Sequence, residues 1–149
     1  MIIQTIGALF ATIALAIILG VPKKFTLLVG LVGAIGWWVY LAMGEGEEHI
    51  AFRTFIAALI VALVSYSFAR ILKAPVTVFL ISGILPLVPG TGMYRTVYHF
   101  IAGNGAMVSY YFSQTLQLAG VIALAIFIMD SIFRILQQKV PIKKKKKGM

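Results

Sequence analysis

The sequence predicts an all-helical membrane protein with five transmembrane helices, the fourth of them broken near the membrane midplane. Hydrophobic residues make up 61% of the 149 residues and charged residues only 11%, whereas charged residues are about 25% of a soluble domain. Apolar runs of about 20 residues, the length that a helix needs to cross the hydrocarbon core, alternate with short polar segments. One polytopic membrane domain over residues 1–149 accounts for this length.

Short polar or helix-breaking segments mark the ends of the predicted spans. No basic residue precedes the first apolar run, so we interpret that run as a retained span and not as a cleaved signal peptide. Pro22 cannot continue the first helix, and residues 44–49 form a glycine-rich acidic loop. The spans are predicted at residues 3–21, 25–43, 50–69, 75–102 (broken) and 106–133, followed by a basic tail at 134–149.

The distribution of basic residues discriminates between two topologies for residues 75–102, a re-entrant hairpin and one broken span. If the segment crosses once and the turn at 22–24 is cytoplasmic, eleven of the thirteen basic residues lie inside, and Arg53 and Arg95 are the exceptions. A re-entrant hairpin would place the terminal lysines outside, against the positive-inside bias. We therefore predict five crossings, with the N-terminus out and the C-terminus in.

The net charge of +9 reflects this topology and does not indicate nucleic-acid binding, because the basic residues flank the apolar segments. We expect the terminal run to lie on anionic lipid, at about 1 kcal/mol per lysine. The chain has no cysteine and no common hydrolase, metalloprotease or nucleotide-binding motif, so we expect no enzyme activity, cofactor or metal site. The lysines of the run are Lys143, Lys144, Lys145, Lys146 and Lys147.

The segment "ILPLVPGTGMYR", residues 84–95, contains the predicted break. Pro86 and Pro89 each remove a backbone donor, and Gly90 and Gly92 permit backbone angles that other residues resist. We expect two half-helices, at about 75–86 and 91–102, joined by a non-helical link over Pro86–Gly92. Lipid cannot satisfy the freed backbone groups, so the link must face protein or a polar cavity.

A broken helix offers both kinds of group that bind an amino acid. The half-helix that begins at the break presents amides and a positive dipole end to an anion, and the other half presents bare carbonyls to a cation. Thr91 lies within this link and belongs to the predicted substrate site. The alternative is a kinked packing helix with no ligand, since prolines are frequent in membrane helices.

The last span carries a stripe of polar residues. Tyr110, Ser113, Gln114 and Gln117 follow the i, i+3, i+4, i+7 spacing and therefore share a helix face. Amide side chains at this depth need partners and face the bundle interior. The stripe is either one wall of a substrate path, with Ser113, Gln114 and Gln117 as contacts, or a set of interhelical hydrogen bonds.

Two titratable residues are candidates for proton coupling. His99 can titrate near neutral pH, and it lies one helical turn from Arg95; the alternative places it at the outer interface beside an aromatic belt. Asp130 is the other candidate, although an i, i+4 pair with Arg134 is the simpler interpretation. The acids and the histidine of the 44–49 loop are interpreted as a solvated loop and not as a metal site.

The pattern P-x-x-P-G-x-x-x-Y, from Pro86 to Tyr94, resembles a motif of the threonine/serine exporter family, in its small membrane subunit. The resemblance implies proton-coupled export of threonine and serine from the bacterial plasma membrane, together with a larger partner subunit. It marks Pro86, Pro89, Gly90 and Tyr94. Two other functions stay open: a membrane scaffold that does not transport, and a small channel formed by a homo-oligomer.

Overall fold

The computed structural model describes residues 1–44 and 49–138, and within them every regular element is helical. The predicted all-helical class is therefore confirmed for this part of the chain. The acidic loop residues 45–48 and the lysine run Lys143–Lys147 lie outside the described residues. The elements are α1 (Ile2–Ile18), α2 (Lys23–Ala42), α3 (Ile50–Ile71), α4 (Val76–Ile84), a 3-10 turn η2 (Leu85–Leu87), α5 (Gly90–Ile101) and α6 (Gly105–Gln138).

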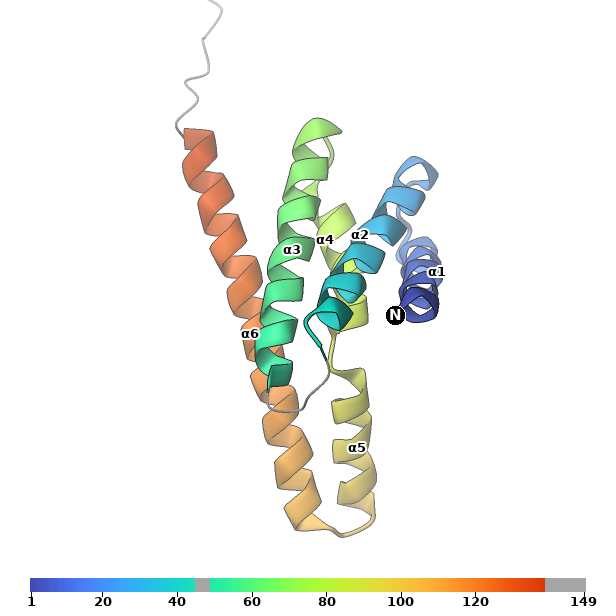
Figure 1. Cartoon of the computed structure of the whole chain (residues 1–149), viewed down its shortest axis with the longest axis vertical. Helices are drawn as coiled ribbons and strands as arrows, with labels where there is room; N and C mark the ends of the chain where they lie inside the picture. The colour runs from blue at the N-terminus through green and yellow to red at the C-terminus, as the bar shows by residue number, and fades with distance from the viewer. Residues whose placement is uncertain (45–48, 139–149) are drawn as a thin grey trace, which may run out of the picture.

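Helices α2, α3 and α4 pack together as the centre of the fold, with α1 against α2 and α6 against α3 (Figure 1). Among the described helices, α5 packs against α6 alone. The 34-residue α6 is long enough to contact α3 with one part and α5 with another. The α5–α6 hairpin consequently extends beyond the ends of α2 and α3 (Figure 1).

Small residues bring the central helices close together. A Cβ atom at Gly33 would overlap the Thr12 side chain of α1, and one at Gly36 would overlap Val61 of α3. Val61 is itself fully buried in a cluster with Val32 and the alanines of α3. Gly30, Gly33 and Gly36, at every third position of α2, thus allow close packing, as small residues commonly do between membrane helices.

Within the described residues, three helices, α2, α3 and α6, are long and apolar enough to cross a membrane, and the α4–α5 pair makes a fourth if it forms one span. Helix α1 has 17 residues and ends three residues before the predicted boundary at 21. It ends there because Gly20 adopts a positive φ of 73°, which closes the helix and leads into Pro22. The count of five spans and the orientation of the termini stay predictions.

The predicted break is present but shorter than expected. The helix axis bends by 53° between Val76–Leu87 and Gly90–Ile101. Val88 is extended, at φ −62° and ψ 132°, and Pro89 is the N-cap residue of α5. The prediction of a non-helical link over Pro86–Gly92 is wrong in two respects. Pro86 lies within the η2 turn, and Gly90, Thr91 and Gly92 form the first turn of α5.

Neither glycine of the break uses the backbone freedom that we expected of it. Positive φ angles occur at Gly20, Gly44 and Gly103, and among the described glycines not at Gly90 or Gly92. A proline at the start of a helix needs no special glycine, because the first amides of a helix have no intrahelical acceptor to lose. The chain therefore resumes its helix directly after Pro89.

Candidate functional site

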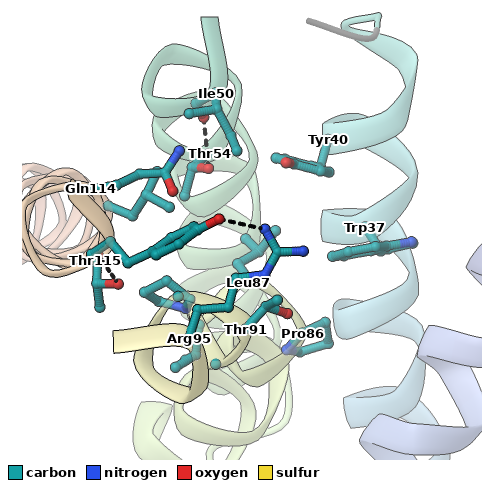
Figure 2. A pocket seen from close by; sticks show the side chains of 16 residues that line it. Trp37, Tyr40, Ile50, Thr54, Pro86, Leu87, Thr91, Arg95, Gln114 and Thr115 are labelled. Carbon is teal, nitrogen blue, oxygen red and sulfur yellow. Dashed lines mark hydrogen bonds between the residues drawn. The ribbon is translucent and has the colours of Figure 1, made fainter. Parts of the chain in front are cut away.

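A cavity of about 300 Å³ lies against the break between α4 and α5. Four helices and the link surround it, so it brings together segments that are far apart in the sequence (Figure 2). Its wall includes Tyr40 near the end of α2 and Ile50 at the start of α3, so the cavity lies toward one end of these helices; the position of the break near the membrane midplane stays a prediction. The lining residues are Trp37, Tyr40, Ile50, Thr54, Pro86, Leu87, Val88, Pro89, Gly90, Thr91, Gly92, Arg95, Tyr111, Gln114, Thr115 and Leu118.

One part of the cavity wall is suited to an anion. The first turn of α5, Gly90–Gly92, lies in the wall, and the amides of a first helical turn carry the positive end of the helix dipole. Arg95, one turn further along α5, is the one charged residue among the described residues that line the cavity. Its Nη1 donates a hydrogen bond of 3.2 Å to the Tyr111 hydroxyl oxygen, and its side chain extends into the cavity (Figure 2).

Hydrogen-bond acceptors lie on the α3 and α6 sides of the same cavity. The Thr54 hydroxyl donates to the Ile50 carbonyl at 2.8 Å, and the Thr115 hydroxyl donates to the Tyr111 carbonyl at 2.7 Å (Figure 2). Because each hydroxyl hydrogen is already used, each oxygen can act toward a ligand only as an acceptor. The Gln114 side chain adds an amide oxygen, so this side suits a donor such as an ammonium group.

Aromatic rings of α2 close the cavity opposite Arg95 (Figure 2). Trp37 and Tyr40 stack with their ring centroids 5.2 Å apart. The buried Arg53 guanidinium lies 4.3 Å from the centroid of the Tyr40 ring. Both rings therefore form part of the cavity wall.

The predicted site residues divide into two groups. Pro86, Pro89, Gly90, Thr91, Gly92 and Gln114 line the cavity, whereas Tyr94, Ser113 and Gln117 do not. The face that α6 turns toward the cavity is Tyr111, Gln114, Thr115 and Leu118, which is the predicted stripe displaced by one residue. Ser113 and Gln117 are exposed.

The close approach of α5 to α6 beside the cavity depends on Gly92. A Cβ atom at Gly92 would overlap the Thr115 hydroxyl oxygen, and its next contact, to the Thr115 Cβ, would be 3.5 Å. Gly90, two residues earlier, has no atom within 4 Å of the same hypothetical position. Of the two glycines in this turn, Gly92 is therefore the one that the packing requires.

His99 and Tyr94 lie beside the cavity and not in its wall. The His99 ring stacks on the Tyr111 ring, with centroids 5.4 Å apart and an interplanar angle of 6°. Tyr94 stacks on Tyr98 at 6.3 Å, on the exposed side of α5. Both residues contribute to a neighbouring cavity that also contains Arg95 and Tyr111.

Asp130 lies far from the cavity, 12 residues or about 18 Å along α6 from Leu118. Both of its carboxylate oxygens are hydrogen-bonded: Tyr66 of α3 donates to Oδ1 at 2.7 Å, and Arg134 donates to Oδ2 at 2.7 Å. The predicted i, i+4 pair with Arg134 is confirmed. The bond from Tyr66, which fastens α6 to α3, had no signal in the sequence.

Several helices long and apolar enough to span a membrane, arranged around a small cavity at a helix break, indicate a multi-pass membrane protein. The comparison with known families agrees with this class: the family described as "Threonine/Serine exporter, ThrE" matches residues 4–132. The chain belongs to the threonine/serine exporter family, and this membership supports membrane transport of small amino acids and favours a transporter over an enzyme. No solved structure matches the chain.

Proposed function

We propose that this chain is a subunit that exports threonine, serine or similar small amino acids across the bacterial plasma membrane, with the substrate bound in the cavity at the α4–α5 break. The observation that carries the proposal is the pairing of an anion-binding side with an acceptor side in one small cavity. A free amino acid carries a carboxylate and an ammonium group and therefore matches both sides. The cavity, at about 300 Å³, lies at the lower end of the usual range for ligand sites.

In this proposal the substrate carboxylate binds at the first turn of α5 and the Arg95 guanidinium. The ammonium group donates to the oxygens of Thr54, Thr115 and Gln114, which face the cavity as acceptors. Trp37 supplies an apolar wall for the side-chain methyl group of threonine. A zwitterion held in this way has each of its charges met by hydrogen bonds, as a desolvated charge requires.

We propose a larger partner subunit because α5 packs against a single helix among those described. Helix α5 contacts α6 alone and has no buried residue, although it carries Arg95 and His99. In the predicted five-span topology α5 lies within the membrane, where charged and titratable groups face protein or a water-filled cavity. We expect the partner to cover this face of α5, while the lysine run Lys143–Lys147 lies on anionic lipid.

Proton coupling is proposed at His99 in preference to Asp130. His99 stacks on Tyr111, and Tyr111 accepts the hydrogen bond from Arg95. A change in the protonation state of His99 would therefore act on the cavity through one intervening ring. Asp130 is held by Tyr66 and Arg134, an arrangement that fits a structural link between helices.

Reconstitution into vesicles tests the function. The chain, with and without its larger subunit, is assayed for saturable efflux of labelled threonine, with labelled leucine as the control substrate. We expect saturable threonine efflux in the presence of the partner. Efflux that rises linearly with concentration would indicate a homo-oligomeric channel, and no efflux with a correctly assembled partner would indicate a scaffold; either result would contradict the proposal.

The topology is tested in the same cysteine-free background. Single cysteines are introduced at Asn104, in the α5–α6 turn, and at Gly148, in the tail, and are labelled with a membrane-impermeant thiol reagent. We expect Asn104→Cys to react from outside intact cells and Gly148→Cys to react only after the membrane is opened. Outside labelling at position 148 would refute the five-span topology with a cytoplasmic C-terminus.

A further inference from the structure

A second cavity of about 370 Å³ lies beside the first, between α5 and α6. It is lined by Tyr94, Arg95, Tyr98, His99 and Tyr111. Arg95 and Tyr111 also line the first cavity, and they are the two residues that the linings share. The second cavity lies on the side of α5 that leads from the break toward the α5–α6 turn.

The boundary between the two cavities is the contact between Arg95 and Tyr111. The guanidinium Nη1 donates to the tyrosine hydroxyl at 3.2 Å, and the guanidinium carbon lies 5.3 Å from the ring centroid. The ring itself is held by His99, which stacks on it, and by Tyr110, which meets it edge-on at 5.1 Å. The Tyr111 ring thus has two aromatic neighbours, whereas the guanidinium lies at the end of a long, flexible side chain.

We infer that the Arg95–Tyr111 pair is a gate between the two cavities, and that the second cavity is a transient site for the carboxylate of the transported amino acid. Among the described residues of the two linings, Arg95 is the one with a permanent charge. A carboxylate that passes from one cavity to the other can therefore keep the same guanidinium as its partner while it displaces the Tyr111 hydroxyl. Carboxylates bind guanidinium groups more strongly than a neutral hydroxyl does, so the substrate itself opens the gate.

This inference rests on the proposed function for the identity of the ligand, and it gives roles to residues that the first cavity leaves unused. His99 is a positioning residue, because it acts through the Tyr111 ring. Tyr94 and Tyr98, which stack on each other at 6.3 Å, form the outer wall of the second cavity. Tyr94, the tyrosine of the P-x-x-P-G-x-x-x-Y pattern, thus lines the second cavity, through which the substrate leaves the break.

Cysteine accessibility tests the gate without requiring transport. A reporter cysteine at Gln114 lies in the first cavity only, and one at Tyr94 lies in the second only. Each is labelled in membranes by an impermeant thiol reagent added on the side of the α5–α6 turn. Tyr111→Phe removes the hydroxyl and keeps the ring, and Tyr110→Phe is the matched control because Tyr110 lines neither of these cavities.

We expect Tyr111→Phe to speed the labelling of Gln114→Cys about tenfold, the change that corresponds to losing one hydrogen bond to a charged group. The labelling of Tyr94→Cys should stay the same, and Tyr110→Phe should change neither reporter. Equal labelling of Gln114→Cys with and without the Tyr111 hydroxyl would overturn the gate. Equally fast labelling of the two reporters in the parent chain would overturn it as well.

Substrate protection tests the second site. Saturating threonine should slow the labelling of Tyr94→Cys, and threonine amide, which lacks the carboxylate, should not. Protection by both compounds, or by neither, would overturn a carboxylate site in the second cavity. Failure of the proposed function is distinguishable from failure of the gate: the first appears as absent efflux in the unmodified chain with its partner, and the second appears as unchanged labelling when efflux is normal.

Discussion

Gly92 and Thr115 allow the packing between α5 and α6 to be tested by a double-mutant cycle. In the parent chain, a Cβ at Gly92 overlaps the Thr115 hydroxyl oxygen; once that hydroxyl is removed, the nearest remaining contact is the Thr115 Cβ at 3.5 Å, an ordinary van der Waals separation. Gly92→Ala should therefore destabilise the parent chain and be tolerated when Thr115 is alanine. Gly90→Ala is the control, since its Cβ meets nothing within 4 Å.

The magnitude follows from two opposing effects. Replacing glycine by alanine in a helix stabilises it by up to about 1 kcal/mol, and overpacking costs about 1–3 kcal/mol. Gly90→Ala should therefore be neutral or stabilising, and Gly92→Ala should lower the free energy of unfolding by up to about 2 kcal/mol. In the Thr115→Ala background the overlap is absent, so the coupling energy between the two sites should be about 1–3 kcal/mol.

The assay is reversible unfolding of the four proteins of the cycle in detergent micelles, followed by circular dichroism. A coupling energy within about 0.5 kcal/mol of zero, the usual limit of additivity for independent sites, would refute the contact. An equal loss of stability in Gly90→Ala and Gly92→Ala would also refute it, because the structure gives the two glycines different surroundings.

Three further predictions concern the contact between α3 and α6, the break between α4 and α5, and the pH dependence of transport. Tyr66→Phe removes the bond to Asp130 and should lower the free energy of unfolding in the same assay; no change would contradict the link between α3 and α6. Combined Pro86→Ala and Pro89→Ala should straighten the helix, keep the folded yield and reduce threonine efflux, whereas normal efflux would refute a binding role for the break. His99→Gln should abolish the pH dependence of efflux while the protein still inserts; an unchanged pH profile would return His99 to a structural role beside Tyr111.

The helices and the break could be predicted from the sequence because they depend on local properties. Apolar runs bounded by Pro22 and by the 44–49 loop gave the first three helices to within a few residues. Two closely spaced prolines located the bend between α4 and α5. The predicted length of the link was too great, because a proline at the start of a helix costs no hydrogen bond and the glycines after Pro89 continue as helix.

The lining of the cavity could be predicted only in part, because it depends on where other helices lie. The stripes that begin at Tyr110 and at Tyr111 have the same spacing, and the approach of α5 through Gly92 selects the second. Polarity favoured the first stripe, with Ser113 and Gln117. Thr54 and Thr115 were missed because threonine is common in membrane helices, where its hydroxyl bonds to its own backbone.

Binding of threonine to this cavity is the central claim, and Trp37 offers the most direct measurement of it. The chain has two tryptophans, so Trp38→Phe leaves Trp37, a lining residue, as the single reporter. Titration of the purified protein with threonine should give a saturable change in Trp37 fluorescence. Threonine amide cannot pair with Arg95, so its dissociation constant should be higher by about tenfold or more. No saturable change, or equal binding of threonine and its amide, would contradict the account.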